Sequence, residues 1–333
     1  MFHPILLFSL LLINVPSSHG FSTPAIPTKQ APSSLFTRHF PSEKVKTLQH
    51  ELVLTYLEIN GFLMTTAGVT ILIDPLLEGP LDFGIPDIYT GKKKNLPLSS
   101  LCEALPPVDC LLLTQGLDDH AHVRTLTKLA ANANFDQVPI VAPPSARGAL
   151  ESSGMLRPSN VRFLRHGERT NIGAKNNASK DAGSINILAT KGALVGPPWQ
   201  TRENGYILRP SFSSTTGRLP PSVYIEPHVE FQVPELAKEA PVDCVITPIV
   251  GQRLPILDLV YGPSNAVKLI ETLRPKVVIP MPNANVDQSG IAASLVSENG
   301  SEDDFFRLLA KSNAASTKVQ KLRPGQDEII QFD

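Results

Sequence analysis

An apolar run in the first half of the chain ends in a cluster of groups that can bind a metal ion. The segment reads LLLTQGLDDHAH over residues 111–122 and places Asp118, Asp119 and His120 directly after the run. A second strand-like segment, VYIEPH, ends in Glu226 and His228. Carboxylate oxygens and imidazole nitrogens are ligands through which proteins hold zinc and iron. These residue types make a metal site one interpretation of the segment 111–122.

The same cluster also has an ordinary structural interpretation. Aspartate is a favoured N-cap, so Asp118 or Asp119 is expected to cap the helix that the sequence predicts from residue 120. His122 is then expected to be an exposed residue of that helix. Asp74 precedes Pro75 at the end of VTILID and is expected to accept backbone hydrogen bonds at a turn.

The elements that carry these residues form a repeated pattern. The sequence PVDCLLLT at 107–114 matches PVDCVITP at 241–248, and VPIVAPPS at 138–145 has its counterpart in KVVIPMPN at 276–283. Helical segments lie between the strands of each pair, at 120–133 and 263–273. Two β-α-β units with an all-β stretch between them predict a pseudo-duplicated architecture in which each unit contributes parallel strands.

We therefore expect an α/β (α+β) fold in which two mixed sheets pack face to face and helices cover the outer faces. The folded domain is predicted to span residues 48–333, with functional residues at one edge of the sandwich, where strands end. Cys110 and Cys244 lie inside apolar runs and are predicted to be buried thiols, since three cysteines form no disulfide framework.

Five segments, taken in chain order, resemble the metallo-β-lactamase superfamily. They are ILIDPLL, LLLTQGLDDHAH, NGYIL, VYIEPH and VVIPMPN, and the similarity covers about residues 50–330. The branch that looks most similar is the one of ascorbate-phosphate-lactonase-like proteins. The resemblance implies a four-layer αββα sandwich with pseudo-duplicated halves. It also implies metal ions that activate water to attack an ester, lactone, amide or phosphodiester bond.

The metal loop of that family, H-x-H-x-D-H, is incomplete in this chain. Gln115 and Leu117 stand where the resemblance places the first two histidines, so only Asp119 and His120 of the loop remain. Leucine has no donor atom, and an amide oxygen is a weak neutral ligand. The site that depends on the two missing imidazoles is therefore expected to be weakened.

Other ligand positions of the family differ as well. Ile59 and Asn60 lie where a histidine is often found, Pro282 and Asn283 replace the last histidine, and His228 lies where the bridging carboxylate is expected. The resemblance implies at most one ion, zinc, iron or manganese; the alternative is that none binds. The ligands it implies are Asp119, His120 and His228, with additional or supporting residues Asp74, Gln115, Asp118, Glu226 and Asn283.

The leading hypothesis is a divergent hydrolase with a small-molecule substrate and with Asp119 as both ligand and orienting base. Trp199 and Arg202, in the segment VGPPWQTRENGY, are expected to contact that substrate. The first alternative is a non-catalytic binding or assembly protein that keeps the fold and has lost the metals. A further alternative is oxygen chemistry on iron. A net charge of −1 predicts no nucleic-acid partner, and no membrane partner is expected.

The N-terminal residues are predicted to be a targeting sequence. Residues 1–20 contain the short apolar stretch ILLFSLLLINV and resemble a cleaved signal peptide. Residues 21–47 begin with Phe21, are rich in Ser, Thr and Pro, and resemble a transit peptide. This two-part arrangement predicts import into a plastid (chloroplast). The alternative is a secreted protein with an N-terminal tail.

Overall fold

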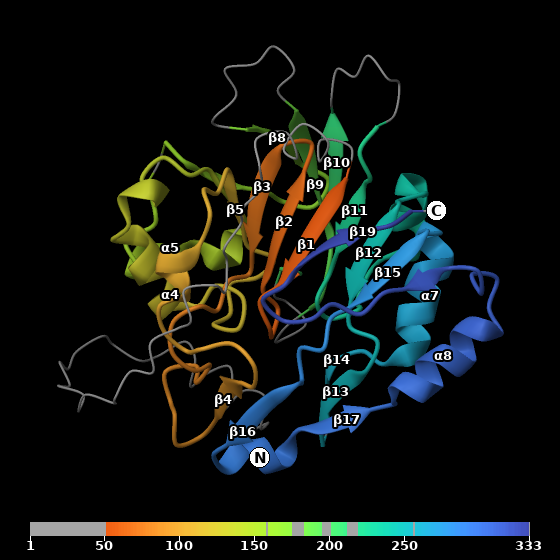
Figure 1. Ribbon diagram of the computed structural model, residues 1–333. Helices are drawn as coiled ribbons and strands as arrows, with labels where there is room; N and C mark the ends of the chain where they lie inside the picture. Colours follow the sequence, from red (N-terminus) through yellow and green to blue (C-terminus); the bar gives the residue numbers. More distant parts are fainter. Residues whose placement is uncertain are drawn as a thin grey trace.

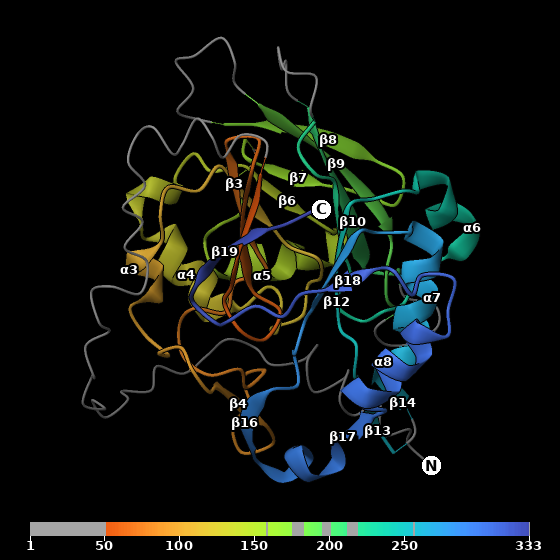
Figure 2. The same ribbon diagram turned by 45° about the vertical axis from the view of Figure 1, so that its right-hand side comes forward.

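The computed structural model describes residues 51–157, 159–174, 183–194, 201–211, 219–255 and 257–332. The predicted signal segment 1–20, the predicted transit segment 21–47 and Trp199 lie outside the described residues. Two seven-stranded sheets face each other as the central layers of the molecule (Figures 1 and 2). No helix in the described part of the chain is both long enough and apolar enough to cross a membrane.

The first sheet joins an antiparallel meander to a run of parallel strands. Its order is β19-β1-β2-β3-β5-β6-β7, in which β3, β5, β6 and β7 are parallel. The strands are β1 (Leu52–Tyr56), β2 (Phe62–Thr66), β3 (Val69–Ile73), β5 (Cys110–Leu112), β6 (Ile140–Ala142), β7 (Val161–Phe163) and β19 (Asp327–Ile330).

The second sheet repeats this plan with the second half of the chain. Its order is β18-β15-β12-β11-β10-β9-β8, and β11, β12, β15 and β18 are parallel. The strands are β8 (Arg169–Gly173), β9 (Ser184–Lys191), β10 (Asn204–Ser211), β11 (Val223–Ile225), β12 (Cys244–Thr247), β15 (Val277–Pro280) and β18 (Lys318–Val319).

The aspartate of the repeated PVDC sequence makes the same kind of hydrogen bond in both sheets. The carboxylate of Asp109, just before β5, accepts the backbone N–H of Thr70 at 2.8 Å. The carboxylate of Asp243, just before β12, accepts the backbone N–H of Ser222 at 3.0 Å. Each aspartate thus ties the start of its strand to the start of the parallel neighbour, and the predicted pseudo-duplication is confirmed.

Helices cover both outer faces, as Figure 2 shows. The helices α3 (Leu101–Ala104), α4 (Val123–Ala130) and α5 (Arg147–Ser152) lie against the first sheet, and α6 (Val233–Leu236), α7 (Pro263–Leu273) and α8 (Glu302–Ala310) against the second. The predicted four-layer αββα fold is therefore confirmed. Cys110 and Cys244 are fully buried in the core between the sheets, also as predicted.

Two small sheets lie beyond the edge at which β3, β12 and β15 end (Figure 1). One pairs β4 (Thr90–Lys93) with β16 (Val286–Ser289), and the other contains β13 (Gly251–Leu254), β14 (Leu257–Val260) and β17 (Ser297–Asn299). Strand β4 pairs antiparallel with β16, so this small sheet joins two segments that lie far apart in the chain.

Candidate metal centre

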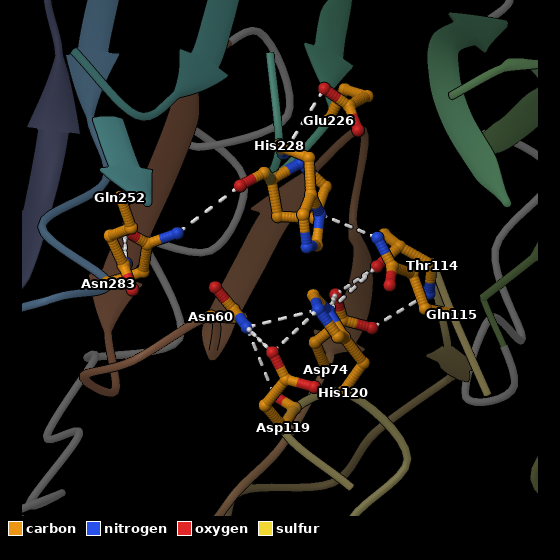
Figure 3. Close-up of polar contacts among 11 residues, drawn as sticks. Asn60, Asp74, Thr114, Gln115, Asp119, His120, Glu226, His228, Gln252 and Asn283 are labelled. Carbon is orange, nitrogen blue, oxygen red and sulfur yellow. Dashed lines mark hydrogen bonds and ion pairs between the residues drawn. The ribbon is translucent and has the colours of Figure 1, made fainter. Parts of the chain in front are cut away.

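Three of the predicted ligands lie together where strands of the two sheets end. Atoms of Asp119, His120 and His228 that could bind an ion all lie within 4.8 Å of one another. Asp119 and His120 follow β5 in the first sheet, whereas His228 follows β11 in the second (Figure 3). The two histidines are buried, and their ring centroids are 5.4 Å apart. Face-to-face packing of the sheets therefore brings together residues from both halves of the chain.

The loop after β5 follows a tight course toward the other half. The backbone N–H groups of His120 and Ala121 donate to the carbonyl oxygen of Leu117 at 3.0 and 2.7 Å. A Cβ atom on Gly116 would lie 2.4 Å from the carbonyl oxygen of Ser145. Glycine is therefore required at this close approach, which leads the loop past the segment after β6.

Asp74 holds His120 from behind. Its Oδ2 lies 2.8 Å from Nδ1 of His120 and also accepts from the hydroxyl of Thr114, while its Oδ1 accepts the backbone N–H of Thr114 at 2.7 Å. A carboxylate at Nδ1 fixes the ring and leaves Nε2 of His120 facing Asp119 and His228. This arrangement is common behind metal-bound histidines. The structure thus places Asp74 where a supporting residue was expected.

Charge is unevenly distributed between the two histidines. Burial opposes protonation of His120, but the carboxylates of Asp119 and Asp74 outweigh it and raise the pKa of His120 to about 10. Burial would also raise the pKa of Asp119, yet His120 lowers it overall. Burial, followed by the charge of His120, lowers the pKa of His228 to about 3. His228 is therefore neutral, beside a negatively charged Asp119.

Gln115 contacts His228 rather than offering an oxygen to the group. Its Nε2 lies 2.6 Å from Nδ1 of His228, and because an amide nitrogen only donates, Nδ1 accepts. Neutral His228 then carries its proton on the other ring nitrogen, which faces His120 in Figure 3. Among the described residues, Oε1 of Gln115 is buried with no hydrogen-bond partner.

Asn60, which was not among the predicted ligands, contacts two of the three residues. Its Nδ2 donates to the carbonyl oxygen of Asp119 at 3.2 Å and to Oδ2 of Asp119 at 3.3 Å. The same nitrogen lies 3.2 Å from Nε2 of His120, a contact that is a hydrogen bond only when Nε2 carries no proton. The only indication in the sequence that Asn60 belongs to the site was its position in the segment EING, where the family often has a histidine.

Glu226 and Asn283 lie beside the group rather than within it (Figure 3). Oε2 of the buried Glu226 accepts the backbone N–H groups of His228 at 3.2 Å and Glu230 at 2.9 Å, so it shapes the loop after β11. Asn283 donates to the carbonyl oxygen of Pro227 at 3.2 Å and accepts from Gln252 at 3.0 Å.

Asp118 faces the helix that follows. Its Oδ1 accepts the backbone N–H of Val123, the first residue of α4, at 3.2 Å. The N-cap residue itself is His122 and not an aspartate, so the expected aspartate N-cap was wrong, although Asp118 still satisfies one free N–H group of the first turn. The expectation that His122 is exposed was wrong. His122 is fully buried and its Nδ1 lies 2.9 Å from Oγ1 of Thr125. The helix begins three residues later than expected, so His122 ends the loop instead of lying on the outer face of α4.

Arg202 pairs with an acidic residue. Its guanidinium forms an ion pair with Glu230 and donates to the carbonyl oxygen of Gly192 at 3.0 Å. Glu230 also accepts the backbone N–H of Leu194 at 2.9 Å. These contacts fasten the two described ends of the Trp199 segment to the loop after β11.

Comparison with a family model agrees with this fold. A model described as a beta-lactamase superfamily domain matches residues 53–282, which is more than half of the chain. No curated protein matches the chain.

Solved structures share the fold at low sequence identity. Igni18, a metallo hydrolase from the archaeon Ignicoccus hospitalis, is 16% identical with a TM-score of 0.53, and the match covers 85% of this chain and 99% of that one. CmlA, a diiron β-hydroxylase from Streptomyces venezuelae, is 16% identical with a TM-score of 0.54, over 85% of this chain and 54% of that one. The isothiocyanate hydrolase from Delia radicum gut bacteria is 15% identical with a TM-score of 0.50, over 84% and 99%.

Proposed function

Since the chain belongs to the β-lactamase superfamily, we propose that it is a metal-dependent hydrolase with one divalent ion held by Asp119, His120 and His228. The observation that carries this proposal is the convergence of the three side chains within 4.8 Å, with the Asp74 carboxylate behind His120. Igni18 and the isothiocyanate hydrolase, which share the fold, are named as hydrolases, and this supports the same class of reaction.

The donor set fits a single cation. Within the described part of the chain, three buried oxygens at the site accept no hydrogen bond: Oδ1 of Asn60, Oε1 of Gln115 and Oδ1 of Asp119. Buried acceptors without partners are rare, and an ion bound nearby is one physical explanation for them. Two imidazoles and one carboxylate suit zinc, and also iron or manganese.

The residues have separable roles in such a reaction. A bound divalent ion would lower the pKa of a water molecule and polarise the bond that is attacked. Asp119 would offer Oδ2 to the ion, and its Oδ1, which has no hydrogen-bond partner among the described residues, could orient the attacking water and accept its proton. Asp74 keeps the His120 ring in place. We propose an ester, lactone or phosphoester bond in a small molecule as the substrate class.

A binding or assembly protein without a metal is the second candidate function. The observation in its favour is that an amide N–H group already faces one acceptor on each of two proposed ligands. Asn60 donates to Asp119, and Gln115 donates to His228. These hydrogen bonds hold Asp119 and His228 in place without an ion.

Metal content separates the two functions. The full chain, produced with zinc, iron and manganese supplied in turn, should contain one equivalent of one of these metals by elemental analysis. The double variant Asp119→Ala/His120→Ala should lose it, whereas the control Asp136→Ala, at an exposed ion pair with Arg157, should retain it. A wild-type chain that carries no metal under any of these conditions would refute the metal-dependent function, and metal that persists in the double variant would refute the ligand assignment.

We also propose plastid targeting, which rests on the composition of residues 1–47 alone. A fluorescent protein fused after this segment should accumulate in the plastids of an alga that imports its plastid proteins through the secretory route. Export of the fusion from the cell would contradict the proposal and favour a secreted protein.

A further inference from the structure

Asn60 stands at a position that suits a further ligand. Its Nδ2 is 3.3 Å from Oδ2 of Asp119 and 3.2 Å from Nε2 of His120, and these two atoms are themselves 3.2 Å apart. Ligands at about 2.0–2.2 Å from a tetrahedral zinc ion lie roughly 3.3–3.6 Å from each other. The three atoms therefore have nearly the spacing of one face of a coordination tetrahedron.

The atom that Asn60 presents at this corner cannot bind a cation. An amide nitrogen only donates hydrogen bonds, whereas the amide oxygen has the lone pairs of a ligand. That oxygen is buried and has no hydrogen-bond partner among the described residues. Water cannot easily supply one, because Asn60 is only 2% exposed. A half-turn of the amide exchanges oxygen and nitrogen within the same volume. It would replace hydrogens that face the ion with a lone pair.

Gln115 repeats this pattern at the second histidine. Its amide nitrogen faces Nδ1 of His228, and its buried oxygen has no partner in the described ranges. After a half-turn, Oε1 would accept a hydrogen bond from Nδ1–H of His228, as the Asp74 carboxylate does from Nδ1–H of His120. The proton of neutral His228 would then leave the ring nitrogen that faces the site, and a lone pair would become available there.

The backbone that presents Asn60 is held in an unfavourable conformation. Glu58 and Ile59 have positive φ angles of 66° and 59°, which are disfavoured for non-glycine residues and most of all for β-branched isoleucine. The backbone N–H of Leu57 donates to the carbonyl oxygen of Gly61 at 2.8 Å and closes the turn. Strain of this kind is concentrated at ligand-binding and catalytic positions.

The carboxylate of Glu58 clamps the same turn from the other side. It is 2% exposed and accepts the backbone N–H groups of Lys94 at 3.2 Å, Asn95 at 3.1 Å and Leu96 at 2.7 Å. The segment after β4 therefore holds the strained turn closed and keeps the Asn60 amide against Asp119 and His120.

From these contacts we propose that Asn60 is a further metal ligand through Oδ1, and that Gln115 is a positioning residue that accepts Nδ1–H of His228. Both amides make a half-turn when the ion binds. The inference rests on the proposed metal-dependent function, and it assigns these two amides specific roles in that site.

Variants of Asn60 test the ligand role through affinity and spectrum. Asn60→Asp keeps the shape and presents an oxygen without a turn, so it should tighten Zn²⁺ binding by about tenfold or more in competition with a chromophoric chelator. Asn60→Leu should weaken binding by at least about tenfold, and the visible bands of bound Co²⁺ should change in intensity and position. The control Asn134→Asp, which adds the same charge at an exposed amide, should change neither.

Variants of Gln115 test the positioning role. Gln115→Glu accepts Nδ1–H and cannot donate, so it should tighten Zn²⁺ binding, whereas Gln115→Leu should weaken it by about 10–100-fold. The Co²⁺ spectrum should keep its form in Gln115→Glu, because the ligands themselves are unchanged.

The outcomes distinguish this inference from the proposed function. If the wild-type chain binds one ion that depends on Asp119 and His120, and Asn60→Asp and Asn60→Leu both bind within twofold of wild type, the ligand role of Asn60 is wrong and the function stands. Should Asn60→Leu fail to fold, Asn60→Asp alone decides the matter. A wild-type chain without an ion would overturn both, even if Asn60→Asp gained one, since Asn60 would then exclude the ion instead of binding it.

Discussion

At the scale of single residues, the two histidines of the site differ in what lies behind their rings. His120 has the Asp74 carboxylate at Nδ1, at 2.8 Å, and His228 has the Gln115 amide there, at 2.6 Å. A carboxylate accepts a hydrogen bond from Nδ1–H, whereas an amide nitrogen donates a hydrogen bond to an unprotonated Nδ1. His120 is therefore already oriented as a ligand, and His228 becomes one only after its neighbour turns.

Replacing Asp74 should show how much this orientation contributes. In Asp74→Asn the charge behind His120 is lost and one oxygen must serve both His120 and Thr114. We expect the affinity for Zn²⁺ to fall by about 10–100-fold, as for other residues that support a metal-bound histidine. Asp136→Asn, at a half-exposed surface ion pair, is the control and should bind as the wild type does. Equal affinities for the wild type and Asp74→Asn would show that Asp74 has only a structural role.

Glu203 should make the stability of the protein depend on pH. Burial is the largest influence and raises its pKa to about 7 from 4.5, although Ser145 Oγ donates to the carboxylate at 2.5 Å and opposes this. The folded state then binds the proton more tightly than the unfolded state. The free energy of unfolding should therefore fall as the pH rises from 4.5 to 7, by at most about 3 kcal/mol from this residue.

Urea unfolding at pH 5 and pH 7.5 measures this effect. Other buried carboxyl groups, such as Glu226 with a pKa raised by burial to about 8, contribute a slope of the same sign. The comparison is therefore between the wild type and Glu203→Gln, which keeps the shape and does not titrate. The wild type should lose about 2–3 kcal/mol more than the variant between these pH values. Parallel pH profiles for the two proteins would contradict the assignment.

At the scale of elements, the metal loop depends on a close approach between two strand ends. The loop after β5 passes the segment after β6 at Gly116, where any side chain would meet the backbone of Ser145 and Ala146. Asp118 then accepts the backbone N–H of Val123 at the start of α4, and the tight turn at Leu117 leaves Asp119 and His120 facing the second sheet. The positions of the ligands thus follow from the packing of one loop against its neighbour.

A methyl group at Gly116 should disturb this packing. Because a Cβ would lie 2.4 Å from the carbonyl oxygen of Ser145, the loop must shift in Gly116→Ala. We expect a loss of about 1–3 kcal/mol in the free energy of unfolding, together with weaker Zn²⁺ binding. The matched control is Gly148→Ala in α5, where a Cβ meets nothing within 4 Å, and this variant should be as stable as the wild type or slightly more. Unchanged stability and ion affinity in Gly116→Ala would show that the loop is not constrained there.

At the scale of the whole molecule, the two halves share one core. Side chains from both sheets form a single buried cluster that includes Cys110 of β5 and Cys244 of β12. The candidate site lies at the edge of that cluster and takes ligands from both sheets. The halves are therefore expected to unfold together, although each repeats the same strand order.

The reactivity of the two thiols during unfolding tests whether the halves unfold together. We expect Cys110 and Cys244 to become reactive toward a thiol reagent at the same urea concentration, as measured by mass spectrometry of the labelled peptides. The physical reason is that neither sheet can expose its inner face without exposing that of the other. Labelling of one cysteine at a clearly lower urea concentration than the other would mean that the halves unfold independently.

Local patterns in the sequence determined the strands, the helix at 263–273, the repeated PVDC units and hence the layered fold. The choice of Asp119, His120 and His228 as ligands came from the resemblance to the metallo-β-lactamase superfamily, which matches residue types in chain order. Only the tertiary structure decided that His228 faces the other two, since this depends on how the two sheets pack. It also decided that His122 is buried, and that Asn60 reaches the site from a turn with positive φ angles. Such contacts are set by long-range packing, which no local pattern of residues encodes.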